Sequence, residues 1–251
     1  MSPRRGGDLG ASIVPGRRAV IELLRAQRRR VLSVAIARGR DSAAVLDEIE
    51  QLAAHTGAPV QLVDAERLRK DAGIETAQGV LARAAPINPT PLADLLGAPD
   101  AFLVALDGVT DPRNLGAVLR TALGAGATGV IVPRHRSAPL SPAAVKAAAG
   151  AVEHLPIAAV GGVAAALEHA SRAAVWTVGL DADAEADIRD IGVADRPLVL
   201  VLGAEGSGLP RLVRSRCDVL ARIPMRGPIE SLNVAAAAAV ACFEVARHRR
   251  H

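Results

Sequence analysis

Hydrophobic and polar positions alternate along the chain in a way that predicts two successive α/β regions. In the first, helical periodicity at residues 18–29, 42–57 and 65–73 alternates with short apolar runs at 31–37, 59–64 and 78–84. The apolar runs have the length of strands, so we expect a small α/β unit over residues 1–84. The next stretch, APINPTP at 85–91, holds three prolines that oppose both helix and sheet, and it predicts a linker over 85–99.

The pattern then restarts and continues to the end of the chain. Apolar runs at 101–109, 129–133, 174–180, 197–203 and 219–225 predict strands, and helical periodicity predicts helices at 112–126, 141–155, 161–173 and 230–250. Strands that are apolar on both faces and separated by helices are typical of a parallel sheet with helices on both sides. We therefore expect a doubly wound α/β domain over residues 100–251.

Composition narrows the class of protein. Half of the residues are hydrophobic and 22% are charged, which favours a compact folded chain over a disordered one. The sequence has no apolar run of membrane-spanning length and no secretory signal, so we expect a cytoplasmic protein. Its two cysteines, Cys217 and Cys242, match neither a disulfide framework nor zinc spacing, and we expect free thiols and no metal.

Positive charge is concentrated at the start of the chain. Residues 1–40 contain ten arginines against Asp8 and Glu22, a net charge of +8, within a chain whose total is +4. A polyanion such as RNA explains this distribution, because phosphate contacts release counterions; a solvated helix end is the alternative. With only three aromatic residues, Phe102, Trp176 and Phe243, recognition by base stacking is not expected.

Three segments place polar residues or glycines directly after a predicted strand, where open α/β sheets bind their ligands. The first, residues 106–122, carries Asn114 and Arg120 behind Asp111, which suits a helix cap. The second, LVLVLGAEGSGL at 198–209, runs into three glycines and Glu205. The third, residues 222–240, has Ser231 and Asn233 before an alanine-rich helix; Ser231 suits a helix cap, and Asn233 is a poor helix former.

Taken in order, these three segments resemble the signature motifs of the SpoU (TrmH) family of RNA ribose 2′-O-methyltransferases, within the SPOUT superfamily. The start GRRAVIELLR and the end QGVLARA of the first region resemble the L30e-like RNA-binding domain of the RlmB-like branch, which acts on guanosine of 23S ribosomal RNA. Relatives often carry histidine at the positions of Arg18 and Ala77, so the chain departs from the branch in its RNA-binding domain and leaves the RNA target open.

The resemblance implies an L30e-like RNA-binding domain at 1–84 and a SpoU catalytic domain at 100–251 with a C-terminal trefoil knot. It implies a homodimer with the active site near the subunit interface. It also implies S-adenosylmethionine as cofactor, held at Gly203, Ile223 and Leu232. The catalytic set that it implies is Asn114, Arg120, Glu205, Ser231 and Asn233.

The chemistry of these residues suggests roles for them. Methyl transfer is an in-line displacement, so the enzyme must position the ribose oxygen and help to remove its proton. A guanidinium does not readily lose its proton, so Arg120 is expected to lower the pKa of the hydroxyl or to hold the adjacent phosphate. Glu205 is expected to orient Arg120 or to accept the proton through water, while the other three position the loop and substrate.

Other functions remain open at this stage. The substrate is either 23S ribosomal RNA, another ribosomal site of the kind modified for antibiotic resistance, or transfer RNA. A non-catalytic RNA-binding assembly factor with the same fold is a further alternative. The glycines after the strand at 197–203 read G-x-x-G-x-G near the C-terminus rather than G-x-G-x-x-G in a first strand, which disfavours a dinucleotide enzyme.

Overall fold

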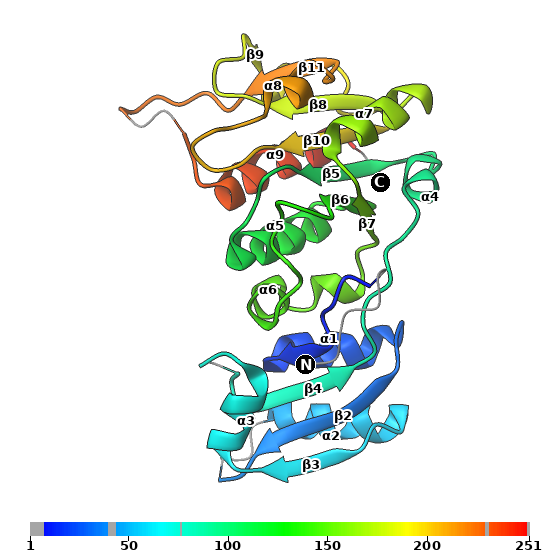
Figure 1. Ribbon diagram of the computed structural model, residues 1–251, viewed down its shortest axis with the longest axis vertical. Helices are drawn as coiled ribbons and strands as arrows, with labels where there is room; N and C mark the ends of the chain where they lie inside the picture. The colour runs from blue at the N-terminus through cyan, green and yellow to red at the C-terminus, as the bar shows by residue number, and fades with distance from the viewer. Residues whose placement is uncertain (1–7, 40–43, 76, 229–230, 250–251) are drawn as a thin grey trace. The chain divides into compact units, whose positions relative to one another are not determined.

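The computed structural model describes residues 8–39, 44–75, 77–228 and 231–249 (Figure 1). Its contacts divide the chain into two compact units. Unit 1 comprises residues 1–88 and 139–154, and unit 2 comprises residues 89–138 and 155–251. The domain limits expected from the sequence, 1–84 and 100–251 with a linker at 85–99, stay a prediction. No helix in the described part of the chain is long and apolar enough to cross a membrane.

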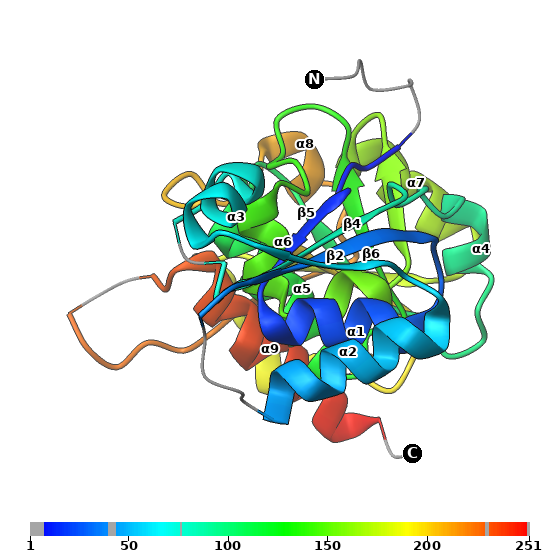
Figure 2. The ribbon, with the colours of Figure 1, turned by 90° about the horizontal axis from the view of Figure 1, so that it is seen from below.

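Unit 1 is built on a four-stranded sheet in the order β1-β4-β2-β3. Its strands are β1 Ile13–Pro15, β2 Val31–Ala37, β3 Val60–Val63 and β4 Val80–Ala84, and its first helices are α1 Arg17–Ala26, α2 Ala44–Thr56 and α3 Ala65–Ala72. β4 runs antiparallel to β1 and β2, and β3 is parallel to β2. Helices α1 and α2 lie side by side (Figure 2). They do so because α1 buries one apolar face, which includes Val20 and Leu24.

A later segment completes unit 1. The sequence predicts one helix at 141–155, and this prediction is wrong: helix α6 (Pro142–Ala148) and the 3-10 turn η1 (Ala151–Glu153) are separated by two left-handed residues. These are Ala149 at φ 51° and Gly150 at φ 98°. Only glycine fits at position 150, because a Cβ there would lie 2.4 Å from the Cβ of Glu22 in α1. The tight packing against α1 therefore breaks the helix.

Some of the N-terminal arginines have structural partners inside unit 1. The guanidinium of Arg29 donates to both carboxylate oxygens of Glu153, at 2.9 and 2.6 Å, and to the carbonyl oxygens of Ala11 and Ala85. Arg28 donates to the carbonyl oxygen of His154 at 3.0 Å. Arg29 is buried, so it is not available to RNA phosphates. The basic N-terminal region is in part an internal scaffold.

Unit 2 is a seven-stranded sheet in the order β7-β6-β5-β10-β8-β11-β9, and all of its strand pairs are parallel. Its strands are β5 Phe102–Leu106, β6 Gly129–Pro133, β7 Ile157–Val160, β8 Trp176–Leu180, β9 Ala186–Asp187, β10 Leu198–Leu202 and β11 Val219–Arg222. Its helices are α4 Leu92–Leu96, α5 Pro112–Gly124, α7 Val163–Arg172, α8 Arg211–Arg214 and α9 Val234–His248, with a 3-10 turn η2 at Ile188–Asp190. The parallel α/β fold expected from the sequence is confirmed.

Several short elements were not anticipated. β1, β7, β9 and α8 have too few residues to show a clear period, and α4 lies inside the stretch expected to be a linker. The last helix was predicted to begin at Glu230, which lies outside the described residues; in the structure, α9 begins at Val234.

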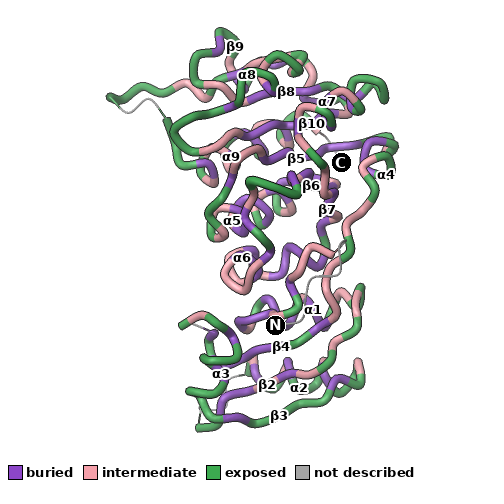
Figure 3. The backbone as a smooth tube through the Cα atoms, viewed as in Figure 1, coloured by how far each residue is buried: buried purple, intermediate pink, exposed green. Residues whose placement is uncertain are grey.

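The core of unit 2 has two layers, one on each face of the sheet. Alternate residues of β5 and β10, such as Leu103 and Val201, pack with α4, α7 and α8. On the other face, α5 and α9 pack against each other. Every residue of β5 and β10 is buried, and Figure 3 shows these two central strands as a continuous buried stretch. The burial on both faces explains why the strands are continuous apolar runs.

Candidate active site

The three segments singled out in the sequence meet at the carboxyl edge of the parallel sheet. β5 and β10 are neighbours and run in the same direction, so the loops that follow them start side by side. The N–H of Asp107 donates to the carbonyl oxygen of Leu202 at 2.9 Å. One residue later, a Cβ at Gly108 would lie 2.9 Å from the Cβ of Ala204. The loop before α5 therefore lies directly against the loop that carries Glu205.

One polar cluster joins a residue from each of the three segments. Asn114, in the first turn of α5, donates its side-chain amide to Oε1 of Glu205 at 2.7 Å. Asn233 donates to the same oxygen at 2.5 Å and to Oδ1 of Asn114 at 3.3 Å. Two amide donors on one carboxylate oxygen hold Glu205 in a defined position. Asn114 and Asn233 are 119 positions apart in the sequence, so only the tertiary fold brings them together.

Helix caps fix two members of this region. Oδ1 of Asp111 accepts from the N–H groups of Arg113 at 2.6 Å and of Asn114 at 3.3 Å, with Pro112 in the first turn of α5, as the sequence predicts. At α9, the prediction that Ser231 is the cap is wrong. Asn233 is the N-cap, and its Oδ1 accepts from the N–H of Ala235 at 2.8 Å. Its amide group thus remains free to contact Glu205, which accounts for a poor helix former at this position.

Next to the cluster is a cleft of about 470 Å³. Its lining includes Gly203, Ile223 and Leu232, the three residues expected to hold a cofactor, together with Glu205, Ser231 and Asn233. Aliphatic side chains and glycine backbone make up most of the rest. Such a wall offers N–H and C=O groups and apolar contact, and it suits a small organic molecule.

A tight turn shapes one side of the cleft. Ala204 and Gly208 exchange two backbone hydrogen bonds, at 3.1 and 3.0 Å, so the loop that carries Glu205 closes on itself. A Cβ at Gly203 would lie 2.2 Å from the carbonyl carbon of Gly208, which excludes every side chain at that position. Gly203 is required by this close approach, and its backbone stays open to the cleft.

Arg120 is the one expected catalytic residue that the structure brings neither to the cluster nor to the cleft, whereas Ser231 lines the cleft. It lies on α5 six residues after Asn114, which places it about 9 Å further along the helix axis and about 120° around it. Its side chain is exposed and does not line the cleft. In the described part of this single chain, its guanidinium makes no hydrogen bond and no ion pair.

Two carboxylates of the region were missed by sequence reasoning. Asp181 lines the cleft just after β8; it forms an ion pair with Arg214 at 3.1 Å and accepts a hydrogen bond from the N–H of Asp183 at 2.9 Å. Asp107 follows β5, and partial burial raises its pKa, an effect that the charge of Arg136 opposes. Both directly follow an apolar strand, which is the signal that singled out the other segments and would have found these as well.

The cysteines are free thiols within the described structure, as expected. Burial raises the pKa of Cys242 to about 12, and burial with the nearby charges of Asp218 and Asp181 raises the pKa of Cys217 to about 12. Neither thiol has the lowered pKa of a nucleophile.

Fold and site together define a parallel α/β protein with a small-molecule cleft beside a fixed amide–carboxylate cluster. Comparisons with known proteins specify the class. A model of the SpoU rRNA methylase family matches residues 101–243, and a model of the substrate-binding domain of RNA 2′-O ribose methyltransferases matches residues 13–90. The chain belongs to the SpoU rRNA methylase family. It is an RNA 2′-O-ribose methyltransferase that depends on S-adenosylmethionine, and the family and class expected from the sequence are confirmed.

Individual relatives extend over almost the whole chain. The 23S rRNA (guanosine-2′-O-)-methyltransferase RlmB of Pseudomonas putida is 42% identical over 241 residues, which cover 94% of this chain and 96% of that protein. An uncharacterized tRNA/rRNA methyltransferase of Mycobacterium ulcerans is 40% identical over 254 residues, 99% of this chain and 81% of that protein.

Solved structures share the fold. The AdoMet-bound rRNA methyltransferase of Sinorhizobium meliloti superposes with a TM-score of 0.78 at 30% identity, covering 94% of this chain and 87% of that one. The SpoU methyltransferase AviRb of Streptomyces viridochromogenes, in complex with AdoMet, also has a TM-score of 0.78, at 25% identity, with 94% and 89% covered.

Proposed function

We propose that this protein methylates the ribose 2′-hydroxyl of a guanosine in 23S ribosomal RNA. The observation that carries the proposal is the cluster of Asn114, Glu205 and Asn233 beside the cleft, because it unites one polar residue from each signature segment. The choice of 23S RNA rests on the RlmB relatives, which are 23S rRNA guanosine-2′-O-methyltransferases and match over nearly their full length. An RNA substrate of this kind is met in the cytoplasm.

The cleft fits the cofactor. Its aliphatic and backbone lining suits an adenosine, and the carboxylates of Asp181 and Glu205 suit the positive charges of a sulfonium and an amino group. Gly203, Ile223 and Leu232 are the residues that would hold it. When bound, S-adenosylmethionine supplies an electrophilic methyl group. The trefoil knot expected at this end of the chain stays a prediction.

The polar residues divide the remaining tasks. Glu205, fixed by the two asparagines, orients the loop and receives hydrogen bonds from the substrate side. Ser231 at the rim positions the ribose. Arg120 stabilises the developing negative charge on the 2′-oxygen as a permanent cation, since a guanidinium stays protonated. These assignments are part of the proposal.

In a homodimer, Arg120 of one subunit would reach the cleft of the other subunit. Helix α9 exposes Ala236, Val240 and Phe243 along one line, and the exposed fractions of Val240 and Phe243 are 45% and 55%. This apolar face belongs to the helix that packs against α5, which carries Arg120. A second copy that covers this face would bury the apolar side chains and bring Arg120 into a subunit interface.

Residues 1–84 are proposed as the L30e-like RNA-binding domain, residues 85–99 as the linker and residues 100–251 as the catalytic domain. The match of the substrate-binding model to residues 13–90 supports the first assignment. Arg17 and Arg18 at the start of α1 are exposed or half-exposed and remain candidates for RNA contact, unlike the buried Arg29.

The test is transfer of labelled methyl groups from S-adenosylmethionine to unmodified 23S ribosomal RNA, followed by mapping of the modified nucleotide. We expect a single 2′-O-methylguanosine. Arg120→Ala should lower the rate by about 10²-fold or more, the range for loss of one donor to a developing oxyanion, with cofactor affinity retained. Arg172→Ala, an exposed arginine at the end of α7, is the matched control and should transfer at the wild-type rate.

Each alternative has its own outcome. Label in a different ribosomal nucleotide would point to the resistance type, and label only in transfer RNA would overturn the 23S assignment. Absence of cofactor binding would indicate a non-catalytic RNA-binding factor. An Arg120→Ala enzyme that is as active as wild type would remove Arg120 from the mechanism.

A further inference from the structure

The loop after β6 gathers positive charge at the same sheet edge as the active site. Residues 134–136 read Arg-His-Arg, and all three are exposed. Because β6 lies next to β5 and parallel to it, this loop begins beside the loop that leads to Asn114. The two loops are also joined: the N–H of Ala138 donates to the carbonyl oxygen of Val109 at 2.9 Å. The basic loop is therefore anchored to the loop that leads to the active site.

Charge differs between the two sides of the polar cluster. On the side of β10 and β8, the cleft carries the carboxylates Glu205 and Asp181. On the side of β6 lie Arg134, His135 and Arg136. The acidic side suits a cationic cofactor, and the basic side suits an anion. A ribose whose 2′-hydroxyl lies at the cluster carries a phosphodiester on its adjacent 3′-oxygen, so an anion must lie within a few bond lengths of the reacting oxygen.

Arg136 is the member of this loop that the structure ties to the site. Its backbone has φ 59°, a left-handed conformation that is unusual for a residue with a side chain. Its charge acts on Asp107, the half-buried carboxylate at the end of β5. Within the described chain, no hydrogen-bond donor reaches the Asp107 carboxylate. Arg136 and Asp107 form neither an ion pair nor a hydrogen bond in the described chain, so the carboxylate attracts the guanidinium only through longer-range charge. The N–H groups of Arg136 therefore stay available for a ligand.

We propose that Arg136, on the loop that the Ala138–Val109 hydrogen bond ties to the β5–β6 edge and within reach of the charge of Asp107, binds the RNA phosphodiester next to the methylated ribose, and that Arg134 extends this contact along the backbone. Arg136 touches substrate, whereas Asp107 is a positioning residue that acts through Arg136. The inference rests on the proposed RNA methyl transfer and names the part of the site that receives the RNA backbone.

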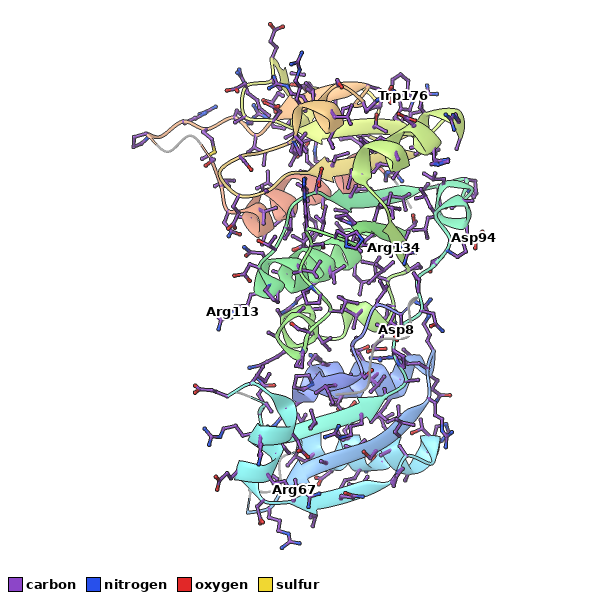
Figure 4. All side chains as sticks on the ribbon, viewed as in Figure 1. Asp8, Arg67, Asp94, Arg113, Arg134 and Trp176 are labelled. Atoms are coloured by element: carbon purple, nitrogen blue, oxygen red, sulfur yellow. The ribbon has the colours of Figure 1, made fainter. Side chains whose placement is uncertain are left out.

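Figure 4 labels Arg134 at the end of β6, and it shows Arg113 extending into solvent from the start of α5.

The test compares full-length Arg136→Ala, Arg136→Lys and Asp107→Asn with wild type and with Arg172→Ala. Arg172 is an exposed arginine of the same unit at the amino end of β8, away from the cluster. Binding of an unmodified 23S RNA fragment is measured from roughly 50 to 200 mM salt, because affinity that comes from phosphate contacts falls steeply over this range. The KM for RNA, kcat and the Kd of S-adenosylmethionine are measured separately.

For Arg136→Ala, we expect an RNA Kd and KM raised about tenfold, as for loss of one charge-assisted hydrogen-bonded contact. The slope of log K against log salt should fall by about one, because one phosphate contact is gone, and the cofactor Kd should not change. Arg136→Lys should keep the salt slope but only part of the RNA affinity. Lysine keeps the positive charge but lacks the paired N–H donors with which a guanidinium binds a phosphate. Asp107→Asn should raise the KM for RNA more than it lowers kcat.

An Arg136→Ala enzyme with the wild-type KM and salt slope would overturn the inference, even if the enzyme methylates RNA. An equal loss in Arg172→Ala would also overturn it, because the effect would then reflect general charge. If Arg136→Ala lowers the salt slope and the RNA affinity as expected but the wild type transfers no methyl group, the phosphate contact stands and the proposed function fails.

Discussion

At the scale of single residues, three carboxylates at one sheet edge differ because their surroundings differ. Glu205 accepts hydrogen bonds from two asparagine amides, and Asp181 pairs with the charge of Arg214 and accepts a hydrogen bond from a backbone N–H. Asp107 has the charge of Arg136 nearby but, among the described residues, no hydrogen-bond donor, and partial burial raises its pKa. A charged group kept at a cost to stability is typical of a functional site.

Because the charged form of Asp107 is partly buried, we expect Asp107→Asn to raise the free energy of unfolding. A pKa raised above its unfolded value of 3.8 means that the native state holds the proton more tightly, so stability falls as the pH rises from the unfolded pKa through the folded one. Asparagine removes that loss. At pH 7 the variant should be more stable than wild type by at most about 1 kcal/mol, because the exposed part of the carboxyl is screened.

Urea unfolding at pH 7 and near pH 3.5 measures this difference. The stability difference between the variant and wild type should shrink at the lower pH, because the wild-type carboxyl is then largely uncharged, like the asparagine amide. A variant less stable than wild type at pH 7 would show that the charged form of Asp107 is stabilising.

At the scale of elements, α6 and η1 show how one ion pair decides where a segment packs. The segment follows the β6 loop in the chain but belongs to unit 1, and Glu153, 2% exposed, anchors it to Arg29. Both oxygens of Glu153 are engaged, and Arg29 also bonds two carbonyl oxygens. A buried pair that is held by four hydrogen bonds from one guanidinium has a well-defined geometry.

We expect Arg29→Met to destabilise unit 1 by about 3–5 kcal/mol, because it leaves the Glu153 charge buried without a partner. Adding Glu153→Leu should restore a large part of the loss, since the double variant buries no lone charge. The two single variants and the double variant, unfolded in urea, form a double-mutant cycle. Additive losses would mean that the two side chains do not interact.

At the scale of the whole molecule, the exposed line on α9 predicts self-association. Val240→Asp combined with Phe243→Asp places two charges on the apolar face and should convert a dimer into a monomer. Loss of the dimer should also lower the rate of methyl transfer, because Arg120 does not line the cleft in the described part of one chain. Light scattering at micromolar concentration measures the mass.

Leu212→Asp, on α8 with an exposed fraction of 59%, is the control and should remain dimeric. A wild-type protein that is monomeric at micromolar concentration and fully active would contradict the proposed dimer.

The sequence by itself determined the parallel α/β fold, because strands buried on both faces must be continuously apolar, as β5 and β10 are. It also determined the segments of the site, since motifs at strand ends are local in the chain. The tertiary structure alone decided what these residues contact. The bond from Asn233 to Glu205, the break at Gly150 against Glu22 and the burial of Arg29 depend on segments far apart in the sequence. Local periodicity carries no information about such contacts, because they arise from packing between elements.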